Sequence, residues 1–241
     1  MTSTYARSLV AELVRWRRPG WPLLFGIAGG VGVGKTTVAA SLADEVRAAG
    51  LTVAVVCTDG FLFPNDELSR RGLLARKGFP DTFDVESLVA ALDALRKQQP
   101  ADVPVYSHET YDRLPDPVRV EPADVVIVEG VNVLQAEVAE RLHSSMWIEA
   151  HEPHMRAWFF TRFDALCETG EGFYAPLAAM TPEQRRSVAE AAWTGINLVN
   201  FEQHIRPTKY RAMYQLQKNE DHSVRSFAAV GPRRAPQAGR S

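Results

Sequence analysis

The sequence has little cysteine, no long apolar run and no excess of charge of either sign. Its 241 residues include two cysteines, Cys57 and Cys167, which lie far apart and form no Cys-x-x-Cys pair. A disulfide scaffold and a cysteine-ligated metal site are therefore not expected. We predict two reduced thiols.

Charge and hydropathy argue against nucleic-acid and membrane partners. The 27 Lys and Arg residues nearly balance the 29 Asp and Glu residues, and no basic stripe precedes the C-terminal tail. We therefore expect no nucleic-acid partner. No apolar run reaches the length of a membrane span, and charged residues interrupt the apolar pattern of residues 1–18, unlike in a signal peptide. We expect no membrane partner and a cytoplasmic location.

The most informative segment is the glycine-rich stretch from Gly26 to Thr37, which follows an apolar run and precedes a helical pattern. It matches the phosphate-loop motif G-x-x-x-x-G-K-[ST]. Such a loop wraps a polyphosphate with backbone N–H groups and delivers it to a helix N-terminus. A ligand-free turn is the weaker alternative, because the motif and its strand-loop-helix context agree. The predicted nucleotide-binding residues are Gly29, Gly30, Val31, Gly32, Val33, Gly34, Lys35, Thr36 and Thr37.

The chemistry expected of this loop is specific. Lys35 should reach the β and γ phosphates of ATP, and the Thr36 hydroxyl should ligate the Mg2+ that bridges them. The motif does not decide whether the γ-phosphate goes to water, to a protein or to a small molecule.

The rest of the chain predicts an α/β protein, a P-loop NTPase three-layer fold with a mostly parallel central sheet, helices on both faces and a small lid region. We expect a single domain over residues 1–230 and a disordered tail over 231–241. Apolar runs predict buried strands at residues 23–27, 52–59, 123–130 and 145–150. Apolar periodicity predicts helices over residues 4–18, 84–99, 152–167 and 182–205.

Three further segments carry weaker predictions. The charged stretch that begins at Asn65 reads as a solvated helix. The last helix should end before Pro207. The segments KYRAMYQLQK and SVRSFAAV should form short edge strands.

Two acidic residues follow predicted strands, at the sheet edge where open α/β sheets bind ligands. Asp59 is the main catalytic candidate, because an aspartate can orient an alcohol and accept its proton during phosphoryl transfer. Its alternative role is to cap the turn before Gly60. Glu129 is placed to lie near Mg2+, with a backbone-bonding role as the alternative. The cluster of Tyr106, His108 and Tyr111 suits a polar small-molecule pocket.

Several segments together resemble one family, the bacterial type I pantothenate kinases, which are P-loop kinases similar to phosphoribulokinase and uridine kinase. These segments are GGVGVGKTT, TDGFLFPNDEL with RKGFPDTFD, PVYSHETYD, VVIVEGVNVLQ and INLVNFEQHIRPTKYRA. They span roughly residues 25–224, in order and at compatible spacing. The resemblance implies transfer of the γ-phosphate of ATP to the primary hydroxyl of pantothenate, toward coenzyme A, by a homodimer.

The resemblance also implies roles for individual residues. Asp59 would be the base, Lys35 and Arg162 the cations that stabilise the transition state, and Thr36 and Glu129 the residues near Mg2+. The residues implied to line the acceptor pocket are Lys77, Tyr106, His108, Tyr111 and Asn197. Lys218 and His222 match positions beside the adenine.

One departure keeps other functions open. Phe159 stands in the acceptor site where the family usually has a tyrosine that helps hold the pantothenate carboxylate, and the loop over residues 168–173 is shorter. A site that loses such a donor can change substrate. The first alternative is therefore a related kinase for another alcohol, such as a nucleoside or a nucleoside-like natural product. A switch or partition ATPase is less favoured, because it would not need the Tyr106, His108 and Tyr111 cluster.

Overall fold

Strands that are apolar on both faces form the centre of the fold. The computed structural model describes residues 4–18 and 20–231. Every residue of β1 (Leu23–Gly29) and of β7 (Val125–Glu129) is buried. Such uninterrupted apolar runs are typical of parallel strands covered by helices on both sides. The predicted buried strands at these positions are confirmed.

A six-stranded sheet is built around this pair, in the order β10-β9-β8-β1-β7-β2. Neighbouring strands are parallel, except that β10 runs antiparallel to β9. The other strands are β2 (Val53–Cys57), β3 (Ala101–Val103), β4 (Tyr106–Ser107), β5 (Asp112–Arg113), β6 (Val118–Val120), β8 (Ser144–Glu149), β9 (Tyr214–Lys218) and β10 (Val224–Ala229).

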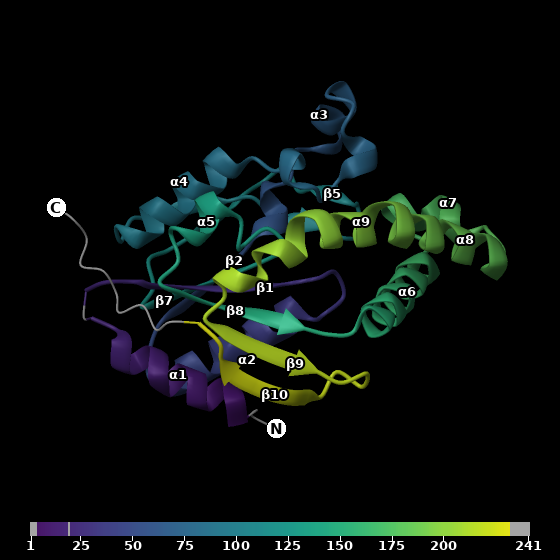
Figure 1. The fold of residues 1–241 in the computed structure, drawn as a ribbon. Coiled ribbons are helices and arrows are strands. Elements are labelled where there is room, and N and C mark those ends of the chain that lie inside the picture. The colour runs from purple at the N-terminus through teal and green to yellow at the C-terminus, as the bar shows by residue number, and fades with distance from the viewer. Residues whose placement is uncertain (1–3, 19, 232–241) are drawn as a thin grey trace.

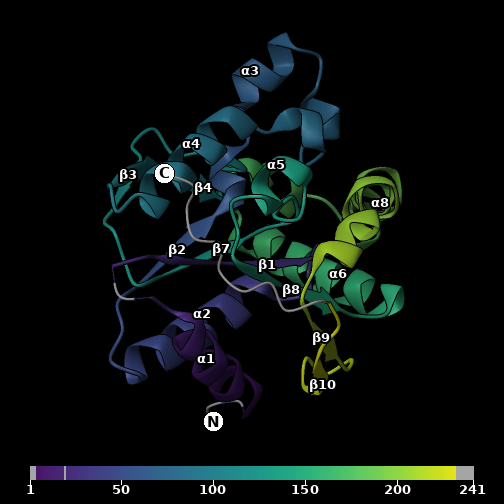
Figure 2. The same ribbon diagram turned by 60° about the vertical axis from the view of Figure 1, so that its left-hand side comes forward.

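Helices cover both faces of the sheet, which confirms the predicted three-layer α/β fold. Both views place α1 and α2 on one face and α4, α5 and α9 on the other (Figures 1 and 2). The α-helices are α1 (Thr4–Trp16), α2 (Lys35–Ala48), α3 (Asn65–Arg70), α4 (Val85–Arg96), α5 (Ala136–Ala139), α6 (Glu152–Thr169), α7 (Ala175–Ala178), α8 (Pro182–Ala192) and α9 (Leu198–Asn200). Short 3-10 helices are η1 (Thr58–Phe61), η2 (Leu74–Arg76), η3 (Pro80–Thr82), η4 (Gly172–Tyr174) and η7 (Arg206–Arg211).

The predicted long helix after residue 182 forms, but not as a regular α-helix. A capping box between Thr181 and Gln184 starts it. Two π-helical segments, η5 (Trp193–Asn197) and η6 (Phe201–Ile205), then flank α9. The chain also continues through Pro207 as the 3-10 helix η7, so the prediction of a stop before this proline is wrong. A proline is tolerated there because it occupies the first turn of the new helix.

The predictions for the C-terminal strands are partly wrong. In KYRAMYQLQK only Tyr214–Lys218 is a strand, and Lys209–Arg211 belong to η7. The strand β9 is also internal, because β8 and β10 flank it, and its alternate residues are buried. Of these two strands, only β10 is at an edge. The other edge of the sheet is β2, which has one buried residue in five, so the prediction of a buried strand at residues 52–59 is wrong in its burial. The predicted disordered tail from 231 lies, except for Gly231, outside the described residues.

The charged stretch from Asn65 also differs from its prediction. Its helix is only α3, which projects from the body of the molecule (Figure 1), and 3-10 turns follow it. Buried Phe79 and Phe83 and the buried chain of Lys77 anchor these turns, so the segment is not a solvated helix. Two small strand pairs, β3 with β6 and β4 with β5, were not predicted. Both cysteines are free, as predicted.

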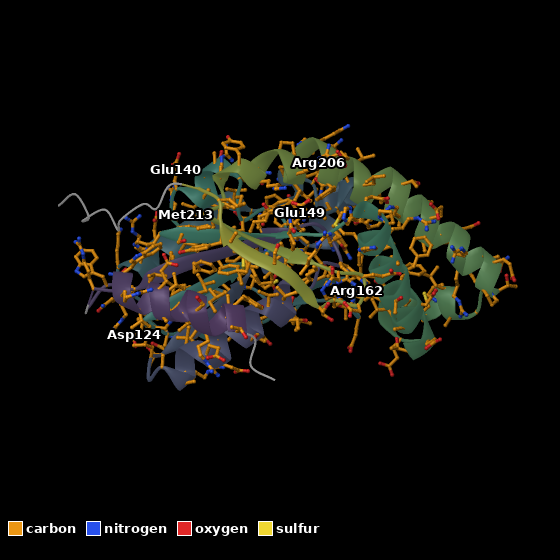
Figure 3. All side chains as sticks on the ribbon, turned by 60° about the horizontal axis from the view of Figure 1, so that its bottom comes forward. Asp124, Glu140, Glu149, Arg162, Arg206 and Met213 are labelled. Atoms are coloured by element: carbon orange, nitrogen blue, oxygen red, sulfur yellow. The ribbon has the colours of Figure 1, made fainter. Side chains whose placement is uncertain are left out.

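Asp124 fastens α1 to the base of the sheet (Figure 3). Its carboxylate accepts hydrogen bonds from the backbone N–H and the hydroxyl of Thr52, each at 2.9 Å, and pairs with Arg17 just beyond α1. The bond from the Thr52 backbone and the charge of Arg17 lower the pKa of Asp124. One carboxylate therefore joins the ends of three elements.

His143 fixes the start of β1 against β8. Its backbone N–H donates to Leu24 O at 2.9 Å, and its Nδ1 accepts from the Leu24 N–H at 3.0 Å. A ring nitrogen that accepts a hydrogen bond carries no proton. Burial, with a smaller effect of the Arg96 charge, lowers the pKa of His143 to about 4.

This histidine should make the fold sensitive to acid. Between pH 6.5 and about 4 the unfolded chain takes up a proton that the folded chain does not. The free energy of unfolding therefore decreases as the pH is lowered through this range. At about 1.4 kcal/mol per unit of pKa difference, the loss is on the order of 2–3 kcal/mol. Denaturant unfolding across this pH range measures it.

Two variants isolate the contribution. His143→Asn keeps an acceptor that does not titrate, so the pH dependence should become flatter. His151→Asn, at an exposed position, should retain the pH dependence of the wild type. An identical slope in wild type and His143→Asn would contradict the assignment.

Candidate active site

The phosphate loop joins β1 to α2. Gly34 has a φ of 79° and caps the N-terminus of α2, a conformation that glycine adopts without strain. A Cβ on Gly34 would also lie 2.8 Å from Lys218 Nζ. The Lys35 ammonium donates to Gly30 O at 3.0 Å, so the lysine folds back over its own loop. Val33 is fully buried and Val31 is half-buried, while Thr36 and Thr37 are exposed at the start of α2.

Lys218, near the C-terminus of the chain, contacts the phosphate loop. It lies at the end of β9, and its buried ammonium donates to Val33 O at 2.8 Å. Burial, with the charge of Lys35, lowers the pKa of Lys218. His222 stacks on Trp158 of α6, with ring centroids 4.1 Å apart. Of the two residues predicted to flank the adenine, Lys218 thus contacts the phosphate loop, and His222 packs on α6.

The two predicted carboxylates end neighbouring strands. In the parallel pair of β2 and β7, Cys57 lies opposite Glu129, and Asp59 follows two residues later in η1. Glu129 is buried, and its Oε1 accepts from the Thr36 hydroxyl at 2.9 Å. This contact joins the end of β7 to the first turn of α2.

Lys35 lies in the field of both acids. Burial lowers the pKa of Lys35, while the negative charges of Glu129 and Asp59 oppose this shift. The positive charge of Arg162, which is exposed on α6 (Figure 3), lowers it further. Lys35 at the phosphate loop is therefore affected by the charges of the other three ionisable residues predicted to act in catalysis or metal binding. These are Asp59, Glu129 and Arg162.

A second cluster gathers around the ammonium of Lys77. It donates to Asn65 Oδ1 at 2.5 Å and to Tyr111 O at 2.6 Å. It also lies 4.9 Å from the ring centroid of Tyr106 and 4.5 Å from that of Tyr111. Burial lowers the pKa of Lys77 to about 8, against the charges of Asp112 and Asp59.

The charge of Asp59 also acts on the rings of this cluster. Burial raises the pKa of Tyr106 and of Tyr111, and the Asp59 charge adds to both shifts. Desolvation lowers the pKa of His108, with the Arg162 charge adding and the Asp59 charge opposing. The His108 ring packs edge-on against Tyr106 at 5.2 Å. The Asp59 charge thus acts both on Lys35 at the phosphate loop and on the Lys77 cluster.

Phe159 belongs to an apolar aromatic wall. Its ring lies within 6.1 Å of three others, those of Phe160, Phe163 and Trp193. The wall continues from Phe163 through Tyr174 and Phe173 to Tyr111. Asn197 is half-buried at the end of η5. No hydrogen bond of the described residues joins it to the Lys77 cluster.

Sequence reasoning missed four contributors. Asn65, Phe173 and Asn200 contact the cluster or its loop, and Cys57 borders the two acids. A single polar or aromatic residue gives no sequence signal for such a contact. Asn65 and Asn200 are partial exceptions, because both lie in segments that carry the resemblance.

The arrangement is suited to phosphoryl transfer. Backbone N–H groups and lysines can hold phosphates, and the charge of a strand-end carboxylate acts on a second, ring-lined cluster. In the part of the chain that the structure covers, no three His, Cys, Asp or Glu side chains group to hold a metal. No helix among those residues is long and apolar enough to cross a membrane.

Comparisons with known proteins agree with this geometry. The profile of the phosphoribulokinase/uridine kinase family matches residues 24–152. A pantothenate kinase of Streptococcus agalactiae serotype III (strain NEM316) is 36% identical over 234 residues, which cover 92% of this chain and 76% of that protein. One of Lactococcus lactis subsp. cremoris (strain SK11) is 38% identical over 216 residues, covering 84% and 71%.

A solved structure, a putative fructose transport system kinase from Silicibacter sp. TM1040, superposes with a TM-score of 0.70 at 24% identity, covering 83% of this chain and 93% of that one. At this identity the likeness shows the fold. The resemblance read from the sequence is confirmed by the family profile and the relatives. The chain therefore belongs to the phosphoribulokinase/uridine kinase family of kinases and, within it, to the pantothenate kinases.

Proposed function

We propose that this kinase transfers the γ-phosphate of ATP to the primary hydroxyl of pantothenate. The observation that carries the proposal is the position of Asp59, whose charge acts on Lys35 at the phosphate loop and on Lys77, Tyr106 and His108 in the second cluster. The relatives named pantothenate kinase supply the acceptor.

On the nucleotide side, the loop from Gly29 to Thr37 would bind the phosphates, with Lys35 on the β and γ groups. The pair of Thr36 and Glu129 fits Mg2+, because it offers a hydroxyl and a buried carboxylate, and Mg2+ takes few protein oxygens beside phosphates. Bound there, Mg2+ would neutralise phosphate charge. Arg162 would face the γ-phosphate as a cation supplied in cis.

On the acceptor side, Asp59 would accept the proton of the attacking alcohol as the new O–P bond forms and the bond to the leaving ADP oxygen breaks. Lys77, Tyr106, His108, Tyr111 and Asn197 would hold the acceptor. Lys77 has three N–H donors, and two are used within the protein, which leaves one for a ligand.

A second candidate is a kinase for another alcohol, such as a nucleoside or a nucleoside-like natural product. Phe159 favours it, because the rings around this residue offer no hydroxyl to a carboxylate on the acceptor.

We further propose that residues 1–230 form one catalytic domain, and that the enzyme is a cytoplasmic homodimer that binds neither nucleic acid nor membrane. Light scattering after gel filtration tests the dimer.

Purified protein with ATP, Mg2+ and a panel of alcohols separates the two candidates. We expect turnover of pantothenate. Phe159→Tyr restores a phenolic donor and should lower the KM for pantothenate by about tenfold, the scale of one hydrogen bond to a charged group. Turnover of another alcohol, with none of pantothenate, would reject the main proposal in favour of the second.

Asp59→Asn should reduce kcat by about two decades or more, because it removes the proton acceptor but keeps the shape. ATP affinity, measured by calorimetry, should change little. Asp81→Asn, at an exposed acid that pairs with Arg76, is the matched control and should retain full activity. A near-normal kcat for Asp59→Asn would refute its role as the base.

The pH profile of kcat/KM for the acceptor should fall above about pH 8. Burial lowers the pKa of Lys77 to about 8, so the ammonium that would donate to the acceptor is present below this pH and lost above it. Lys77→Met should have a lower kcat/KM and should lack this alkaline limb. If the limb is unchanged in Lys77→Met, another group causes it.

A further inference from the structure

A buried amide joins the loop of Lys77 to the C-terminal helix. Asn200 is 4% exposed, and its Nδ2 donates to Gly78 O at 2.7 Å across 122 positions of sequence. Gly78 directly follows Lys77 and has a φ of 99°. The Gly78 N–H donates to the Thr82 hydroxyl at 3.0 Å. Both sides of this glycine are thus fixed, and Asn200 holds the carbonyl side.

A ring contact supports the same connection. Phe79 is buried, and its ring packs edge-on against His204 of η6 with centroids 5.6 Å apart. Asn200 and His204 therefore contact two consecutive residues after Lys77. The helix touches this loop through adjacent turns.

Stability alone does not explain an asparagine at position 200. Its Oδ1 is buried and has no hydrogen-bond partner among the described residues. An unpaired buried acceptor costs free energy of folding, which an apolar side chain of similar volume would avoid. Asn200 also ends α9 between two π-helical segments, and such segments occur frequently at functional sites.

We propose that Asn200 is a positioning residue of the acceptor site. By holding the Gly78 carbonyl, its side chain fixes Lys77 relative to the helix that carries Asn197, three residues earlier. Asn200 itself need not touch the acceptor. This inference rests on the proposed acceptor role of Lys77 and Asn197.

Asn200→Leu removes the donor and keeps an apolar volume in the buried position. We expect the KM for pantothenate to rise by about tenfold or more, the scale of losing a partner of a buried carbonyl, with the KM for ATP unchanged within about threefold. In a double-mutant cycle with Lys77→Met, Asn200→Leu should have no further effect on acceptor affinity, because it acts through Lys77.

Thr208→Val is the matched control. The buried Thr208 hydroxyl donates to Ile205 O at 2.7 Å, so this is also a side-chain bond to the backbone of this helix region, and no hydrogen bond of the described residues joins Thr208 to the Lys77 loop. It should leave the KM for pantothenate unchanged. Asn200→Ala, which loses the donor and adds no bulk, replaces Asn200→Leu if that variant does not fold.

A second readout does not depend on the acceptor. Acylation of Lys77 by acetic anhydride, quantified by mass spectrometry, should be slow in the wild type and about fivefold or more faster in Asn200→Leu, as expected when a buried ammonium gains access to solvent. Unchanged Lys77 protection together with an unchanged KM would overturn the inference. If the wild type does not phosphorylate pantothenate, the proposed function fails, and Lys77 protection alone then decides the role of Asn200.

Discussion

The parallel register of β1, β7 and β2 is the constraint on which the site depends. Glu129 at the end of β7 lies opposite Ile27 of β1 on one side and Cys57 of β2 on the other. The phosphate loop, Glu129 and the segment with Asp59 therefore all lie at the carboxyl ends of neighbouring strands, on the same edge of the sheet. A slip of one residue would turn the side chains of a strand to its other face. Burial of both faces of β1 and β7 makes such a slip costly in these two strands.

Three lysines around the candidate site are removed from solvent. Among the described residues, none of them has a carboxylate within salt-bridge distance. Lys35, Lys77 and Lys218 donate instead to carbonyl or amide oxygens, and burial lowers the pKa of each. Holding ammonium groups in this way costs free energy of folding. An anionic ligand would compensate that cost, so the same arrangement that weakens the free protein favours phosphate binding.

The acceptor side combines polar and apolar walls. Tyr106, Tyr111 and Lys77 form a polar end beside Asp59, and Phe159 belongs to a continuous set of stacked and edge-on rings. Such a site can orient an alcohol at one end while it discriminates by shape at the other. In the proposed acceptor site, the balance between these walls would decide which alcohol binds best.

The sequence by itself determined the nucleotide loop, the central strands and the strand-end acids, because these depend on local spacing and on apolar runs that permit one arrangement. It failed where long-range packing overrides local pattern. Tyr214–Lys218 became internal because Val224–Ala229 pairs outside it, and Lys77 became buried because aromatic residues from a distant hairpin cover it. The bond between Asn200 and Gly78 joins residues 122 positions apart, and no local pattern encodes a contact that exists only once the sheet has brought both segments together.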